Sequence, residues 1–297
     1  SMNITSFTSQ IVCLLQEQLG DGYHVFPRKV TKNNGVTLTG IVARRENINS
    51  FPTIYIDDYY REDIKEEEVQ GIVLKMADRL RLADLKQPVD LSGFVDFEKA
   101  KTRLSFKLIN TEKNKELLTD IPSRPFFNLS IVYFYLIEKA PFKGKATVLV
   151  RRSHMDTWNI TEMELYKAAC INAPQLLPPR IENMNEALGG IFPPELFEDL
   201  IPMYVLTNSE KLFGASCILY RDELKSFAVK MNSDLFILPS SVHEMILIPK
   251  RPDLNQSAFL DIVAEINHSQ VPEEDVLADS VFFYNKKEDA LYLLDNR

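Results

Sequence analysis

The sequence predicts an α+β protein in which mainly antiparallel, mixed sheets are flanked by helices. Short β-rich runs occur in pairs joined by polar turns, a pattern typical of hairpins. Single stretches with apolar residues at helical spacing lie between those pairs. This alternation of hairpins with single helices indicates the α+β class.

Residues 2–90 are predicted to form a small unit with one sheet and two helices. Asn33, Asn34 and Gly35 join two strand-like runs, and an Asn-Gly pair suits a tight hairpin. A stripe of apolar residues follows the acidic segment 62–68 and indicates a covering helix. The expected elements are a helix at 5–19, strands at 23–32, 36–45 and 53–56, and a helix from Val69 to Leu80.

Residues 91–297 are predicted to form a larger α+β unit. Consecutive apolar residues from Leu129 to Ile137 indicate a central strand. Thr161 and Glu164 form a capping box, so a helix is expected to begin there and to end at Pro174. Residues 174–202 read as a Pro-rich excursion or linker, with a helix near 182–188. The other expected elements are strands at 103–108 and 146–150, a helix at 258–266, and a hairpin at 281–284 and 290–294.

The stretch 203–249 is predicted to organise this larger unit. Residues 203–207 and 215–220 are short apolar runs separated by a polar turn, and we expect them to pair as a hairpin. A helix should follow at 221–231, and then a strand at 235–238 that Pro239 breaks. Residues 238–244 form a corner before a last strand at 245–248.

Composition and charge exclude several classes of function. The formal net charge is −8 and the isoelectric point is near 5.2, which argues against binding of nucleic acid or anionic membranes through bulk charge. No apolar run approaches the ~20 residues of a membrane span. The odd set of Cys13, Cys170 and Cys217, each in or beside an apolar segment, is typical of reduced core thiols. We therefore expect a cytoplasmic protein without a membrane partner.

Ser240, Ser241, His243 and Glu244 form the one compact set that combines hydroxyl nucleophiles, a base and a carboxylate. A hydroxyl needs a neighbouring imidazole to lose its proton at neutral pH, and the imidazole needs an orienting acceptor. The spacing matches no known triad signature, and no Gly-x-Ser-x-Gly elbow occurs. The favoured interpretation is structural, with the hydroxyls capping a short helical turn and His243 bonded locally. A catalytic role for this set stays open.

Other candidate positions carry weaker signals. Arg124 and Asn128 lie beside the central strand in an aromatic segment, so Arg124 is a candidate for holding an anionic group, although pairing with a carboxylate of its own fold is favoured. His154 and Asp156 lack further ligands nearby, so no metal site is expected. No Gly-rich phosphate loop, dinucleotide fingerprint or Cys-x-x-Cys pair occurs, and we therefore expect no cofactor.

Segments over nearly the whole chain resemble a bacterial domain-of-unknown-function family of anaerobic, low-GC Gram-positive bacteria, often encoded near mobile elements. The segments are 32–40, 52–56, 124–129, 204–208, 214–220, 238–244 and 279–281, with Trp158, Thr161, Glu162, Leu165 and Tyr166. The later two-thirds resembles, more weakly, a second uncharacterised family of bacilli. The resemblance implies a bacterial cytoplasmic protein and brings no activity, cofactor or site residue.

The sequence therefore predicts a binding or regulatory protein that acts without catalysis. Paired carboxylates, metal-ligand spacing and phosphate loops are missing, while aromatic-rich segments suggest a surface for a protein partner. The alternative is a hydrolase or transferase that uses Ser240 or Ser241 with His243, and Arg124 to hold an anionic substrate. A nucleic-acid-linked role is a third option that the net charge disfavours.

Overall fold

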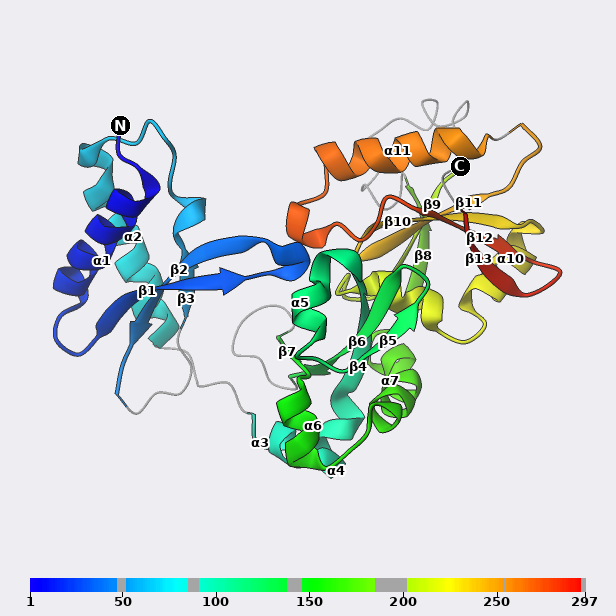
Figure 1. Cartoon of the computed structure of the whole chain (residues 1–297), viewed down its shortest axis with the longest axis horizontal. Helices are drawn as coiled ribbons and strands as arrows, with labels where there is room; N and C mark the ends of the chain where they lie inside the picture. The colour runs from blue at the N-terminus through cyan, green and yellow to red at the C-terminus, as the bar shows by residue number, and fades with distance from the viewer. Residues whose placement is uncertain (47–51, 85–90, 138–145, 185–201, 254, 295–297) are drawn as a thin grey trace. The chain divides into compact units, whose positions relative to one another are not determined.

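The computed structural model describes residues 1–46, 52–84, 91–137, 146–184, 202–253 and 255–294 (Figure 1). It confirms an α+β fold with antiparallel sheets. The described residues fold into two compact units, unit 1 up to residue 84 and unit 2 from residue 91 onwards. None of the described helices is long and apolar enough to cross a membrane.

Unit 1 is a three-stranded antiparallel sheet with two helices. Its elements are α1 (Ile4–Leu19), β1 (His24–Thr31), β2 (Thr37–Arg44), β3 (Thr53–Tyr55) and α2 (Glu66–Asp84), with the strands in the order β1-β2-β3. Asn3 caps α1, because its side chain accepts the backbone N–H of Ser6 at 2.8 Å. Gly20 ends α1 with φ of 86°, a conformation that glycine adopts without strain.

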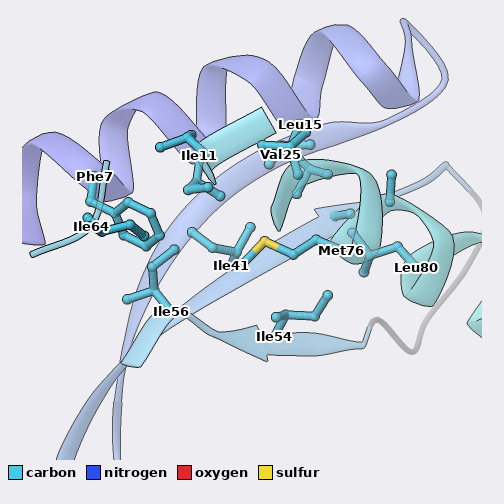
Figure 2. Packing of buried hydrophobic residues seen from close by; sticks show 14 residues of the cluster. Phe7, Ile11, Leu15, Val25, Ile41, Ile54, Ile56, Ile64, Met76 and Leu80 are labelled. Carbon is cyan, nitrogen blue, oxygen red and sulfur yellow. The ribbon is translucent and has the colours of Figure 1, made fainter. Parts of the chain in front are cut away.

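The core of unit 1 lies between this sheet and the two helices. Figure 2 shows Phe7, Ile11 and Leu15 of α1 facing the strands. Val25, Ile41 and Ile54 come from the three strands, and Met76 and Leu80 complete the core from α2 (Figure 2). Because side chains alternate between the two faces of a strand, the neighbours of Val25, Ile41 and Ile54 lie on the sheet's other face.

Unit 2 begins with a four-stranded sheet centred on one fully buried strand. The strands are β4 (Leu104–Asn110), β5 (Ser123–Phe126), β6 (Leu129–Leu136) and β7 (Thr147–Leu149), and β6 pairs with the other three. All eight residues of β6 are buried, as expected for a central strand. The helices of this region are α3 (Ser92–Val95), α4 (Phe97–Ala100), α5 (Lys115–Leu118), α6 (Arg152–Trp158) and α7 (Glu162–Leu176), and α7 packs on β4.

A six-stranded sheet forms the rest of unit 2. Its strand order is β13-β12-β10-β11-β9-β8. The strands are β8 (Pro179–Asn183), β9 (Tyr204–Asn208), β10 (Leu235–Ser241), β11 (Glu244–Pro249), β12 (Val281–Asn285) and β13 (Ala290–Leu294). The helical elements are the 3-10 helix η5 (Gly214–Leu219), α10 (Glu223–Met231) and α11 (Gln256–Ser269). The closing hairpin predicted at 281–294 is confirmed as β12 and β13.

The hairpin expected over 203–220 is wrong in its second half. Residues 214–219 form the buried 3-10 helix η5 instead of a strand. The turn before it is closed by Asn208, whose side chain accepts the backbone N–H of Leu212 at 3.0 Å and donates to the Leu212 carbonyl at 2.7 Å. A short apolar run has no period that separates a strand from a buried helix, so tertiary packing decided its structure.

Two prolines do not end the elements that contain them. β10 continues through Pro239 to Ser241, with a register shift between Leu238 and Ser241, and a proline is tolerated at such an irregularity. Pro174 lies inside the last turn of α7, which ends at Leu176. The excursion expected over 174–202 therefore includes the end of α7 and all of β8. Residues 185–201, including most of the helix expected at 182–188, lie outside the described residues.

Candidate functional site

The Ser-His corner, made of Ser240, Ser241, His243 and Glu244, is the tip of the β10–β11 hairpin. Ser241 pairs with Glu244 across the two strands, so Val242 and His243 form the turn. Ser240 and Ser241 are only 2% and 4% exposed. The Ser241 hydroxyl accepts the backbone N–H of His243 at 3.1 Å. The corner is thus a tight turn between strands rather than the helical turn that we expected.

Both ring nitrogens of His243 have partners other than the serines. Nδ1 accepts the backbone N–H of Phe213 at 3.0 Å, so the ring proton belongs on Nε2. Nε2 lies 3.3 Å from Oδ1 of Asp275. The imidazole also stacks on the Phe213 ring, with centroids 5.5 Å apart. To act as a general base for Ser240 or Ser241, the His243 imidazole would first have to lose one of these contacts.

The corner holds distant parts of unit 2 together. Thr207 donates its hydroxyl hydrogen to the His243 carbonyl at 2.7 Å, and Ala215 donates its N–H to the Val242 carbonyl at 3.3 Å. Gly214 fits between these groups because it has no side chain: a Cβ atom there would lie 2.1 Å from Oγ1 of Thr207 and 2.7 Å from the His243 carbonyl oxygen. These contacts join the β10–β11 turn to β9 and η5, which is the role expected of a structural corner.

Arg124 is held by a carboxylate of its own fold. Its Nε and Nη2 donate to the two carboxylate oxygens of Glu162 at 3.1 and 3.0 Å, a bidentate geometry. The guanidinium lies 3.7 Å from the centroid of the Tyr166 ring, and Tyr133 donates its hydroxyl hydrogen to Glu162 at 2.5 Å. Burial alone would raise the pKa of Glu162, but the hydrogen bonds from Arg124 and Tyr133 outweigh it and hold that pKa below its ordinary value.

Asn128 lies in the two-residue turn between β5 and β6, away from the Arg124 guanidinium's partners. Its side-chain amide donates to the hydroxyl of Ser280 at 3.0 Å, which ties the hairpin tip to the start of β12. The neighbouring turn residue Phe127 has φ of 55° and remains 48% exposed. The structure therefore gives Arg124 and Asn128 separate contacts and does not join them in one ligand site.

An open groove of about 390 Å³ lies beside Arg124. We call it the β5–β13 groove, because Arg124, Pro125 and Phe126 of β5 and Leu291 of β13 line it, together with residues of α7, η5 and the start of α10. The charged lining residues are Arg124, Asp222, Glu223, Lys225 and Asp289. Since Glu162 neutralises Arg124, the remaining lining carries more acidic than basic groups. Burial raises the pKa of Glu223 above its ordinary value.

Lys107 is a half-buried charged group on β4 that the sequence patterns did not indicate. Its ammonium lies 4.1 Å from the centroid of the Phe213 ring, and burial lowers its pKa to about 8. The sequence signal that could have indicated Lys107 is a charged residue in the middle of the alternating strand β4. Glu162 and the groove were also missed, because Arg124 and Glu162 are 38 residues apart and the groove combines several elements.

Neither the cysteines nor His154 lies in a metal site within the described residues. Cys217 is buried, as expected, and burial raises the pKa of its thiol to about 12. Cys13 and Cys170 are exposed, so the prediction that they are core thiols is wrong; each lies on the outer side of an amphipathic helix. His154 accepts the backbone N–H of Arg151 at 2.9 Å through Nδ1. Within the described ranges, no group of three or more His, Cys, Asp or Glu side chains could hold a metal ion.

Residues 4–286 match the model of a family of unknown function, DUF5688. The chain belongs to DUF5688. The DUF5688 match spans both units and includes the Ser-His corner and the Arg124–Glu162 pair, while Asp289 and Leu291 of the groove lie beyond it. No curated protein and no solved structure matches the chain. Membership in DUF5688 assigns no role to these residues, so their chemistry has to be argued from geometry.

Proposed function

We propose that the chain is a binding protein that acts without catalysis and that the β5–β13 groove takes up a segment of a protein partner. The observation that carries the proposal is the open groove itself, with a volume of about 390 Å³. Binding sites are typically concave, mostly apolar and provided with a few placed polar groups. Phe126, Leu219 and Leu291 supply apolar lining, and the acidic groups supply the polar component.

The charges of the groove favour a partner segment with a basic side chain between apolar residues. Three acidic residues line the groove: Asp222, Glu223 and Asp289. The basic lining residues are Arg124, which pairs with Glu162, and Lys225, for which the described residues show no ion pair. Complementary charge guides association and excludes wrong partners. Tyr284 also lines the groove and donates its hydroxyl hydrogen to Asp289, and its ring suits the apolar stem and the cation of a lysine or arginine.

The alternative, a hydrolase or transferase built on the Ser-His corner, has less support. Both serines are almost fully buried, and the two ring nitrogens of His243 are engaged by Phe213 and Asp275. Arg124 is committed to Glu162, which leaves this guanidinium poorly placed to hold an anionic substrate. These contacts support a structural corner.

A pull-down from a lysate of the source organism tests the proposal. Wild-type chain as bait should recover one stoichiometric protein at low salt. The double variant Asp222→Lys, Glu223→Lys reverses the groove's charge and should lose that protein. The double variant Asp261→Lys, Glu265→Lys is the matched control, because it makes the same charge change at two exposed positions of α11 that do not line the groove. It should recover the protein as wild type does.

Two outcomes would count against the proposal. Repeated failure to recover a partner at low salt, or recovery of the same partner by the groove variant, would remove the groove as the binding site. Hydrolysis of an activated ester that His243→Ala abolishes would favour the enzyme. If the corner is structural, His243→Ala should instead lower the melting temperature.

We also propose the bacterial cytoplasm as the location of the protein, with a link to mobile elements. The resemblance to families of Gram-positive bacteria suggests this origin. Cys13, Cys170 and Cys217 are all free thiols, and two of them are exposed, which suits a reducing compartment.

A further inference from the structure

One face of the unit 1 sheet is turned away from α1 and α2. Val25, Ile41 and Ile54 face the helices (Figure 2), and the strand pairs therefore place the alternate residues on the other face, which we call the open face. Residues that are paired across neighbouring strands form rows on this face. The rows are His24 with Arg44, Phe26 with Val42 and Thr53, Arg28 with Gly40 and Tyr55, and Val30 with Leu38. Within the residues that the structure describes, the core formed with α1 and α2 does not include this face. Its centre is nevertheless closely packed, since Val42 is only 4% exposed, and the exposed residues lie toward the ends of the strands.

The open face is basic. Arg28 and Lys32 lie on it together with Arg44, and no aspartate or glutamate occupies any of the strand positions in its rows. Asp57, just beyond β3, accepts the backbone N–H of Thr39 at 2.9 Å. The acidic run Glu66, Glu67 and Glu68 begins α2, in the helix layer. The open face is thus locally basic, although the whole chain has a formal net charge of −8. The helix layer carries charges of both signs, since Lys75, Arg79 and Arg81 also lie in α2.

The same face carries aromatic rings next to the cations. The rings of His24 and Phe26 lie 5.3 Å apart, and the ammonium of Lys32 lies 4.7 Å from the centroid of the Tyr55 ring. Phe26 and Tyr55 are half-buried, and His24 and Arg28 are exposed. Gly40, between Arg28 and Tyr55, has no side chain, and the methyl group of Thr53 packs into that space: a Cβ at Gly40 would lie 2.5 Å from it.

We propose that this open face binds single-stranded nucleic acid. Cations that follow a sheet surface neutralise phosphates, and aromatic rings on the same surface stack with unpaired bases, whatever their sequence. An acidic protein segment could pair with Arg28 and Lys32, but it has no unpaired bases to stack on the aromatic rings. This surface is separate from the β5–β13 groove of unit 2, so the two proposals stand or fall independently.

Fluorescence anisotropy with a short labelled oligothymidylate and the full chain tests this inference. With about three phosphate contacts, the affinity should fall about twentyfold between about 50 and about 200 mM salt. Arg28→Glu should weaken binding at least about tenfold at low salt, and Tyr55→Leu, which removes one stacking ring, about tenfold. Lys75→Glu makes the same charge change as Arg28→Glu at an exposed position of α2 and should change the affinity less than about twofold.

The inference fails if the wild-type chain gives no anisotropy change at low salt, or if Arg28→Glu and Lys75→Glu weaken binding equally. It also fails if a glutamate-rich peptide of equal charge displaces the oligonucleotide more strongly than unlabelled oligothymidylate does, because the face would then fit an acidic protein segment. Because Arg28 is exposed, its variant should keep the wild-type melting temperature, which separates lost binding from lost folding.

Discussion

Among single residues, Lys107 has unusual surroundings for a charged side chain. The ammonium lies over the ring of Phe213, and no ion pair to a carboxylate accompanies it in the described part of the chain. A charge taken out of water in this way is unfavourable, and a cation–π contact recovers only part of the cost. Burial lowers the pKa of this ammonium to about 8.

Replacing Lys107 with methionine should stabilise the protein at neutral pH. The folded pKa of about 8 lies below the ordinary 10.5, so the unfolded chain holds the proton more tightly than the folded chain does. Wild-type stability should therefore rise as pH increases from about 8 to about 10. Lys107→Met should gain about 1–3 kcal/mol at about pH 7 and less than about 1 kcal/mol at about pH 10.

Urea unfolding of both proteins at the two pH values measures this effect. Lys75→Met is the control, because Lys75 is exposed on α2 and its loss should change stability by less than about 0.5 kcal/mol. A destabilised Lys107→Met variant at neutral pH would mean that the ammonium makes a net favourable interaction in the fold.

At the scale of elements, the close approach of η5 to its neighbours explains why this segment is not a strand. Gly214 lies against Thr207 of β9 and the carbonyl of His243, and Ala215 donates its N–H to the hairpin turn. A buried helix start without such partners would leave polar groups unpaired. The Ser-His corner is the acceptor that makes this 3-10 helix stable.

Gly214→Ala should destabilise the protein by about 2–3 kcal/mol, because the added Cβ would overlap backbone and side-chain atoms that cannot move freely. Gly71→Ala is the matched control: Gly71 lies in α2, and a Cβ there meets nothing within 4 Å. That change should stabilise by about 0.5–1 kcal/mol. Thermal unfolding checks both, and equal effects of the two variants would contradict the close packing at η5.

At the scale of the whole molecule, unit 1 has a hydrophobic core of its own. The buried cluster of Phe7, Ile41, Met76 and their neighbours contains residues of unit 1 alone. A core of this kind is the usual basis for independent folding.

Calorimetry should therefore resolve two unfolding transitions. Ile41→Ala removes a fully buried side chain of unit 1 and should cost about 2–5 kcal/mol, lowering the midpoint of one transition by about 10 °C or more. Leu247→Ala, equally buried in β11, should lower the other transition. A single transition, or movement of both midpoints in either variant, would show that the units unfold together.

Elements with a local sequence pattern could be predicted from the sequence alone. The α+β class, the N-terminal helix and hairpin, the central strand β6 and the closing hairpin all follow from periodicity and turn residues within about twenty neighbours. The pairing of Arg124 with a carboxylate was the favoured reading, but the partner itself had no local signal, since Glu162 lies 38 residues away.

The remaining features depend on contacts between elements that are distant in the sequence. Residues 214–219 form a 3-10 helix, and β10 continues past Pro239. The His243 ring contacts Phe213 and Asp275. Each of these features depends on partners that other elements supply. The groove and the open face likewise exist only once strands distant in sequence are brought together. Local periodicity specifies which face of an element is buried, whereas burial, pairing and charge at a site are set by what packs against that face.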